Sequence, residues 1–339
     1  MTDAEKLAER LLQWEERWEH GEDVPASELC QDCPDLADQL QSQIDILKKM
    51  AWMKEGAEPS DDGDSEPADP LVGKTLAGRY RLDAFLAEGG FGRVYRGFDL
   101  ELQRAVAVKI TTAGKARRRA DDLLEEARKV AKLRHPGIVS VHDVGKADDL
   151  HFIVSDLIDG TSLAGIIQGK RPTPEEAAHL VAEVADALAF AHDNGFIHRD
   201  IKPANILLDQ QGKPLIADFG IATGSSDHLD AGVASSGTLA YMAPEQLAGE
   251  IQLIDHRVDV YALGVVLYEL LTGRLPYHAR TPITLREQIL FCQPQPARNR
   301  SIPPQLEQVC HRCLAKHPAD RFATAGKLAV ALRSAIRQA

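Results

Sequence analysis

Apolar residues recur at helical spacing near the start of the chain and at strand spacing further on. Two amphipathic stripes predict helices over residues 4–20 and 34–53, the first stopping at Gly21 and the second starting at Pro34. The stripes consist of Leu7, Leu11, Trp14 and Trp18, and of Leu36, Leu40, Ile44, Leu47 and Ala51. Such helices could pack into a small module. We expect it to be either a protein-docking or dimerising domain or a helical appendage of the part that follows.

Residues 55–70 separate this module from the rest and contain acidic residues, Pro, Gly and Ser with no large apolar side chain. This composition predicts a flexible linker. Beyond it, residues 78–113 alternate between apolar and polar side chains, which predicts strands. The remaining predicted elements are strands over 139–142, 150–155, 206–208 and 214–217, and helices over 117–134, 174–193, 258–272 and 324–337.

The net charge of −12 is concentrated at the start of the chain. Residues 1–70 carry six Lys and Arg against 20 Asp and Glu, whereas the remainder is nearly balanced at 33 against 31. This acidity argues against a nucleic-acid-binding arm. The most apolar run, Val260 to Leu271, is too short for a membrane helix and contains Glu269. The acidic start does not resemble a signal peptide. We therefore expect a cytoplasmic chain, or the cytoplasmic part of a longer membrane-anchored protein.

Five cysteines include two C-x-x-C pairs, Cys30 with Cys33 and Cys310 with Cys313. Two such pairs can hold a zinc ion. The second pair instead follows the apolar stripe of a predicted helix, which favours two core positions. Because the first pair belongs to a different part of the chain, we expect buried cysteines rather than a shared zinc site.

One polar stretch between residues 198 and 220 has the side chains that phosphoryl transfer requires. Asp200 can accept a proton. Asn205 and Asp218 offer oxygen ligands of the kind that Mg²⁺ takes beside phosphate oxygens. Lys202 can place a positive charge against a phosphate.

These residues occur as H-R-D-I-K-P-A-N at 198–205, with D-F-G at 218–220, a combination far more specific than the tripeptide alone. The set resembles the protein kinase family, specifically the eukaryotic-like (Hanks-type) serine/threonine kinases of bacteria. The resemblance covers about residues 78–337 and implies an α+β, two-lobed kinase fold. Its N-lobe would be an antiparallel sheet plus one helix and its C-lobe mainly helical, preceded by the small all-helical module. The implied boundaries are a helical module at 1–54, an acidic flexible linker at 55–72 and a kinase domain at 73–338, with the N-lobe at 73–158 and the C-lobe at 159–338.

The resemblance places the nucleotide site in the first lobe and the hinge. Gly89 and Gly92 match glycines of the family's phosphate-covering loop. Lys109, in an A-V-A-V-K strand, would hold the phosphates of ATP, paired with Glu126; a slip of one position would make the partner Glu125. The residues expected around the nucleotide are Leu86, Gly89, Gly92, Val94, Ala107, Lys109, Asp156, Ile158 and Leu207.

The implied reaction is transfer of the γ-phosphoryl group of ATP to serine or threonine hydroxyls of proteins. Asp200 would orient the hydroxyl and take its proton. Lys202 would neutralise charge on the γ-phosphate and, with Thr238, point to serine/threonine acceptors. Asn205 and Asp218 would hold Mg²⁺, with Mn²⁺ as the alternative.

Three further matches imply structural roles. Asp259 would anchor the backbone of the catalytic loop. Glu245 of the Ala-Pro-Glu motif would pair with Arg321. His198, which first suggests a base, would pack against Phe219 instead.

Residues 221–238 show little periodicity and contain several hydroxyls, so they form either a polar loop or an activation loop that ends at Ala-Pro-Glu. In the family, an arginine in the place of Arg199 pairs with a phosphorylated activation loop and orders it. The resemblance therefore implies regulation by autophosphorylation. The candidate sites are Thr223, Ser225, Ser226, Ser235 and Ser236.

Two other functions stay open on sequence alone. A pseudokinase scaffold would fit the loss of Lys109, Asp200 or Asp218, but only Ala87, which replaces the first glycine of the loop, favours it. A small-molecule kinase shares the Asp and Asn landmarks but generally lacks an activation loop ending in Ala-Pro-Glu. The expected partners are protein substrates and a second copy bound through the N-lobe or the helical module, with no nucleic acid and no membrane segment.

Overall fold

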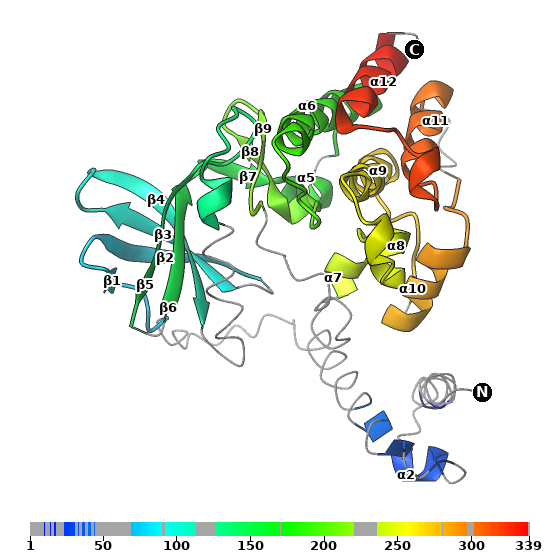
Figure 1. Ribbon diagram of the computed structural model, residues 1–339, viewed down its shortest axis with the longest axis horizontal. Helices are drawn as coiled ribbons and strands as arrows, with labels where there is room; N and C mark the ends of the chain where they lie inside the picture. Colours follow the sequence, from blue (N-terminus) through cyan, green and yellow to red (C-terminus); the bar gives the residue numbers. More distant parts are fainter. Residues whose placement is uncertain are drawn as a thin grey trace. The chain divides into compact units, whose positions relative to one another are not determined.

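The computed structural model divides the chain into two compact units, Met1–Pro67 and Ala68–Ala339. Figure 1 shows the course of the chain from the N-terminus to the C-terminus. The structure describes residues 10, 14, 17, 24–30, 33, 36–37, 40–41, 44, 69–89, 92–112, 127–148, 150–169, 171–219, 236–279, 281–296 and 302–337.

The first unit is helical wherever it has described secondary structure. Helix α2 (Ala26–Leu29) begins after Pro25, and its first N–H group, that of Ala26, donates to Gln41 Oε1 at 3.2 Å. Trp14, Leu40 and Ile44 lie in helical backbone and are buried, as expected for members of the two apolar stripes. The other stripe positions lie outside the described residues, except Leu36, which is partly buried.

A six-stranded antiparallel sheet forms the first half of the second unit, in the order β1-β2-β3-β4-β6-β5 (Figure 1). Alternating side chains of these strands fill one buried cluster that includes Tyr95, Val108 and Val154. The strands are β1 (Thr75–Leu76), β2 (Tyr80–Gly89), β3 (Gly92–Asp99), β4 (Arg104–Thr112), β5 (Val141–Ala147) and β6 (Leu150–Asp156). The start of β5 differs from the expected residue 139, because the Val139 N–H donates to Ile216 O at 2.9 Å instead of pairing with β6.

Residues 69–72, which the sequence assigns to the linker, are bonded to this sheet. The Tyr95 hydroxyl of β3 donates to Asp69 Oδ2 at 3.0 Å, and the Leu71 N–H donates to Asp69 Oδ1 at 2.9 Å. Leu71 packs against the cluster under the sheet. The second unit therefore includes residues 69–72, and the rest of the predicted linker lies outside the described residues.

Helices make up most of the second half of this unit. They are α5 (Leu163–Gln168), α6 (Pro174–Asp193), α7 (Ser236–Leu239), α8 (Pro244–Ala248), α9 (Arg257–Thr272), α10 (Pro282–Phe291), α11 (Pro304–Cys313) and α12 (Ala325–Arg337), with 3₁₀ turns η2 (Pro203–Asn205), η3 (Ile251–Leu253) and η4 (Pro318–Asp320). A small antiparallel sheet joins β7 (Gly160–Ser162), β8 (Ile206–Asp209) and β9 (Pro214–Ile216). The turn of helix at α7 lies where we expected irregular chain.

Helix α9 is the centre of this half, since it is buried on nearly every side and packs against α6, α11 and α12 (Figure 1). A side chain at Gly264 would bring its Cβ within 2.4 Å of Cys313 Cβ, so glycine permits the close approach of α11. Cys310 and Cys313 are buried at this contact, which confirms the expected core positions. Helix α9 ends at Thr272, and the capping residue Gly273 that follows has a left-handed φ of 75°, which favours glycine.

Capping explains where the helix leading into the catalytic loop begins. The Thr173 hydroxyl accepts from the Glu176 N–H at 3.2 Å, and the Glu176 carboxylate accepts from the Thr173 N–H at 2.8 Å.

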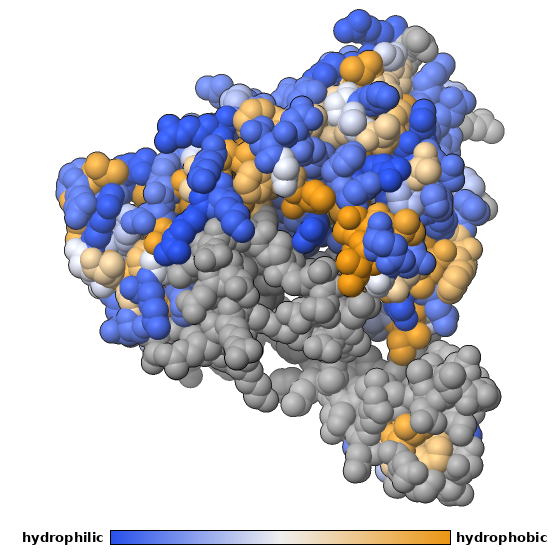
Figure 2. Space-filling model, in the orientation of Figure 1, coloured by the Kyte–Doolittle hydropathy of each residue, from blue (hydrophilic) through white to orange (hydrophobic). Residues whose placement is uncertain are grey.

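Figure 2 shows a mainly hydrophilic face over the strands and α12, with apolar residues gathered around α8. No helix in the described part of the chain is long and apolar enough to cross a membrane.

Candidate active site

Asp259, at the start of α9, binds the backbone of the catalytic loop, residues 198–205. Its fully buried carboxylate accepts from the N–H groups of His198 and Arg199, both at 2.8 Å. His192 Nε2, at the end of α6, donates to the same carboxylate at 2.8 Å. Burial would raise the pKa of Asp259, but these hydrogen bonds and the nearby histidines outweigh it, so the pKa lies below its usual value. Asp259 therefore remains a carboxylate and an acceptor for the loop.

His198 is a packing residue and not a proton acceptor for a substrate. Its ring is buried and lies 4.7 Å from the ring of Phe219, edge to face. Its Nε2–H donates to Ala217 O at 2.9 Å, and its Nδ1 accepts from the Asp200 N–H at 3.3 Å. Both ring nitrogens are therefore engaged with the backbone, in agreement with the packing role that we expected.

The Asp200 carboxylate lies within a small polar cluster. Lys202 Nζ is 2.9 Å from Asp200 Oδ2 and donates to Thr238 Oγ1 at 3.0 Å. Asn205 Nδ2 donates to the Asp200 carbonyl at 2.8 Å and to its carboxylate at 3.1 Å. Four of the residues singled out from the sequence thus meet in one place, although Thr238 comes from α7 and the others from the catalytic loop.

Asp218 faces the sheet of the first half. Its Oδ1 lies 2.9 Å from Lys109 Nζ, so β4 and the residues after β9 meet at this ion pair. The Lys109 side chain is 11% exposed and that of Asp218 is 35% exposed, which leaves room for ligand oxygens on the aspartate side. Glu126, the expected partner of Lys109, lies outside the described residues, as does Glu125.

Two backbone conformations at this site are costly for residues other than glycine. Arg199 has a φ of 65° and Asp218 a φ of 61°, both in the left-handed region. Such residues persist where the surroundings hold them in place. Here the holding groups include Asp259 for Arg199 and Lys109 for Asp218.

The residues expected around the nucleotide come from adjacent strands and the segment after β6. Val94 pairs with Lys109, and Ala107 pairs with Ser155, just before Asp156. Gly92 has a φ of 131°, and a Cβ there would lie 2.1 Å from Ile110 O, so only glycine fits. The remaining members are Leu86, which is exposed on β2, Gly89 at the end of β2, Ile158 after β6, and Leu207 on β8.

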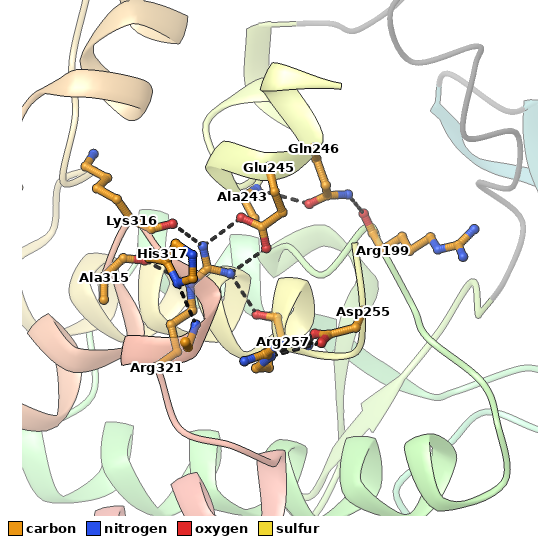
Figure 3. Close-up of polar contacts among 11 residues, drawn as sticks. Arg199, Ala243, Glu245, Gln246, Asp255, Arg257, Ala315, Lys316, His317 and Arg321 are labelled. Carbon is orange, nitrogen blue, oxygen red and sulfur yellow. Dashed lines mark hydrogen bonds and ion pairs between the residues drawn. The ribbon is translucent and has the colours of Figure 1, made fainter. Parts of the chain in front are cut away.

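Helix α8 is fixed by a buried ion pair (Figure 3). Glu245 accepts two hydrogen bonds from Arg321, at 2.6 and 2.7 Å, as we expected. Arg321 also donates to the carbonyls of Ala315 at 2.8 Å and Lys316 at 2.9 Å. The pair therefore connects the Ala-Pro-Glu motif, which ends the predicted activation segment (residues 221–245), to the loop before α12.

Of the five hydroxyl residues expected as phosphorylation sites, one lies in the described part of the chain. Thr223, Ser225, Ser226 and Ser235 lie outside the described residues, and Ser236 is the first residue of α7. Arg199, their expected partner, has a buried Nε for which the described residues provide no acceptor.

Two residues of the site were not singled out from the sequence. His192 bonds Asp259, but a histidine near the end of an amphipathic helix gives no signal of that role. Gln246 bonds the carbonyl of Arg199 at 3.2 Å. Its only signal is its position directly after the Ala-Pro-Glu motif.

The donor set fits a hard cation beside phosphates. Asp218 supplies a carboxylate and Asn205 an amide oxygen, the ligand type that Mg²⁺ prefers when most of its other ligands are phosphate and water oxygens. The described residues hold no group of three or more His, Cys, Asp or Glu side chains arranged for a metal ion. A cation held by these two residues would therefore take most of its ligands from the nucleotide and solvent.

Comparison with known proteins decides the family. The model of the family described as "Protein kinase domain" matches residues 80–331. The chain belongs to the protein kinase family. Its sequence is 36% identical over 274 residues to serine/threonine-protein kinase PrkC of Bacillus subtilis, covering 78% of this chain and 42% of PrkC. It is 39% identical over 265 residues to serine/threonine-protein kinase PknB of Mycobacterium tuberculosis, covering 75% of this chain and 42% of PknB.

A third relative, serine/threonine-protein kinase PknD of Mycobacterium tuberculosis, is 39% identical over 275 residues, which cover 79% of this chain and 41% of PknD. The protein kinase chain thus spans about two-fifths of the length of the curated relatives it matches. Family membership confirms the resemblance inferred from H-R-D-x-K-x-x-N and D-F-G. It also confirms the expected fold, a strand-rich lobe followed by a mainly helical lobe.

Proposed function

We propose that this chain transfers the γ-phosphoryl group of ATP to serine or threonine hydroxyls of protein substrates. The observation that carries the proposal is the cluster of Lys202, Asp200 and Thr238, with contacts of 2.9 and 3.0 Å. The printed names of the relatives PrkC, PknB and PknD support the acceptor class. We propose that the reaction occurs in the cytoplasm, in a cytoplasmic protein or in the cytoplasmic part of a longer membrane-anchored one.

In this mechanism Asp200 orients the acceptor hydroxyl and takes its proton as the new P–O bond forms. Lys202 holds the Asp200 carboxylate and places its charge beside the transferred phosphoryl group. Thr238 fixes Lys202 from the activation segment. The contribution of these residues is positioning and electrostatic stabilisation rather than covalent chemistry.

Asn205 and Asp218 are the residues that would hold Mg²⁺, with Mn²⁺ as the alternative. When bound, the cation neutralises charge on the phosphates of ATP. Lys109 keeps Asp218 oriented toward the phosphates, with Glu126 as its proposed second partner. The adenine would lie between Ala107 on β4 and Leu207 on β8, near the backbone of Asp156 and Ile158.

Regulation by autophosphorylation of the activation loop is part of the proposal. The support is the buried Arg199 Nε, which no described residue satisfies. A phosphorylated hydroxyl has three strong acceptor oxygens and would suit this group. The candidates are Thr223, Ser225, Ser226, Ser235 and Ser236.

We also propose that residues 1–54 form a separate helical module, and that a homodimer forms through this module or the N-lobe. The division of the chain near residue 67 supports the separate module. Analytical ultracentrifugation of the full chain tests the dimer, and a single monomeric species across the concentration range would contradict it.

The test of the proposed function uses the purified chain with labelled ATP and MgCl₂. We expect label on serine or threonine of the chain itself and of a generic basic protein, and none with Asp200→Asn. Mapping of the sites should find them within residues 223–238. Binding of ATP without any transfer would favour a pseudokinase scaffold instead. A site map that misses 223–238 would remove the activation-loop proposal and leave the catalytic one.

A further inference from the structure

Gln246 uses both ends of its side-chain amide. It lies in the first turn of α8, directly after Glu245. Its Oε1 accepts from the Ala243 N–H at 3.0 Å, which caps the helix, and its Nε2 donates to Arg199 O at 3.2 Å (Figure 3). One side chain therefore joins the end of the activation segment to the catalytic loop.

The carbonyl that Gln246 contacts belongs to the peptide group between Arg199 and Asp200. The N–H of the same peptide group, that of Asp200, donates to His198 Nδ1 at 3.3 Å. Both polar ends of this peptide are thus bonded, and its plane determines the direction in which the Asp200 side chain leaves the backbone.

This peptide needs to be held, because Arg199 has a φ of 65°. A left-handed φ is unfavourable for a residue with a side chain, because the Cβ approaches the neighbouring carbonyl oxygen. The Arg199 N–H is bonded to Asp259 at 2.8 Å, which fixes one side of the residue. The Gln246 bond fixes the other side, and without it the carbonyl could rotate toward a less strained conformation.

The backbone of α8 at Gln246 is held in place by the neighbouring Glu245–Arg321 pair. Its neighbour Glu245 is 2% exposed and bonded twice to Arg321, whose side chain is fully buried. The helix backbone at Gln246 is therefore anchored independently of the catalytic loop. Any displacement of α8 would change the distance from Gln246 to Arg199 O.

We infer that Gln246 is a positioning residue for Asp200, linking the placement of α8 and the end of the activation segment to the orientation of the catalytic aspartate. The inference rests on the proposed phosphoryl transfer. It goes beyond that proposal because Gln246 is not among the residues proposed to bind ATP, the cation or the acceptor hydroxyl, and would act only through the Arg199–Asp200 peptide. The other explanation of Gln246 is that it merely caps α8.

The variant Gln246→Glu separates the two roles. Its carboxylate still accepts from the Ala243 N–H, and a glutamate at this position of a helix is a good cap that also suits the helix dipole. It cannot donate to Arg199 O and would face that carbonyl with a negative charge. A capping role thus predicts an unchanged enzyme, whereas a positioning role predicts a slower one.

The experiment uses the 339-residue chain and compares the wild type, Gln246→Glu, Gln246→Met and a control. The control is Gln252→Glu, which adds the same charge at an exposed position on nearby η3. We expect kcat of Gln246→Glu to fall by about 10- to 100-fold, since misplacement of a catalytic group costs rates of that order. The Kd for ATP and the melting temperature should remain those of the wild type. Gln246→Met, which loses both bonds, should show the same kcat loss together with a lower melting temperature. Gln252→Glu should match the wild type throughout.

Two results would overturn the inference: a kcat of Gln246→Glu within twofold of the wild type, or a kcat loss that appears only together with weaker ATP binding and a lower melting temperature. A wild type that transfers no phosphate would contradict the proposed function itself, so the two failures are distinguishable.

Discussion

Lys109 Nζ and Asp218 Oδ1 lie 2.9 Å apart and join the two halves of the kinase unit. The lysine comes from β4 in the sheet, and the aspartate follows β9 in the helical half. The lysine side chain is nearly buried and that of the aspartate is about one-third exposed, so the carboxylate is the more accessible member of the pair. The pair therefore places Lys109, which we propose binds the phosphates of ATP, beside Asp218, which we propose binds the metal ion.

Replacing either member of this pair should cost far more activity than changing the glycine-rich loop. We expect Lys109→Met and Asp218→Asn each to lower kcat/KM by at least about 100-fold, the usual cost of losing one charge-stabilising group. Ala87→Gly should stay within about fivefold, since it only relaxes the backbone. Steady-state assays with labelled ATP measure all three, with exposed Lys146→Met on β5 as the matched control. A Lys109→Met variant within tenfold of the wild type would remove Lys109 from the proposed site.

The Glu245–Arg321 pair should matter for folding more than for chemistry. Both side chains are buried, so Glu245→Gln leaves an arginine charge without its counter-charge. Breaking such a pair typically costs about 3–5 kcal/mol of unfolding free energy. Urea titrations measure this cost. Asp186→Asn, which breaks a partly exposed pair with Arg333, is the control and should cost less than about 1 kcal/mol. Equal losses in the two variants would contradict the structural role of Glu245.

Much of the fold was predictable, because several motifs fix the position of neighbouring elements. The alternation over residues 78–113 gave three strands, and the helices at 174–193, 258–272 and 324–337 appear within one residue of their expected bounds. Asp259 and Arg321 could be assigned because each occurs in a family motif. Their contacts in the structure agree with that assignment.

The contacts that escaped prediction are made by residues with an ordinary local explanation. Gln246 has the position of a helix cap, and nothing in the sequence reveals that its amide also reaches Arg199 O. Asp69 belongs by composition to an acidic linker, yet Tyr95 donates to it from β3. Such contacts join segments far apart in the chain, so periodicity and composition contain no information about them.

Asp69 should influence the nucleotide loop through β3. Its Oδ2 accepts from the Tyr95 hydroxyl and lies 3.4 Å from Arg93 Nη1, directly after Gly92. We expect Asp69→Ala to raise the KM for ATP by about two- to fivefold with little change in kcat, since one hydrogen bond of about 1 kcal/mol is lost near the loop. Asp83→Ala, which removes a surface pair with Arg81 on β2, is the control. An unchanged KM in Asp69→Ala would show that the contact only fastens the start of the second unit to the sheet.

Asp99, at the end of β3, should give the sheet a measurable dependence on pH. Arg79 donates to both of its oxygens, at 2.9 and 2.8 Å, and this hydrogen-bonded partner lowers the pKa of Asp99 from 3.8 to about 2. Burial opposes the shift, and the N–H groups of Leu102 and Glu101 add to it. Because the folded state binds this proton more weakly than the unfolded state, the ionised carboxylate stabilises the fold above its unfolded pKa. That stabilisation is lost as the pH falls from 3.8 toward 2.

The test compares the unfolding free energy of the wild type and Asp99→Asn across pH. We expect the difference in favour of the wild type to be constant from about pH 7 to pH 5 and to shrink below about pH 4. Gln103→Ala, in the same turn, removes the hydrogen bond to Leu100 O without changing a titratable group, so its cost should not vary in this way. A difference for Asp99→Asn that stays flat down to pH 3 or widens there would contradict the argument. In that case the Arg79 contact would stabilise the neutral and ionised forms of Asp99 equally.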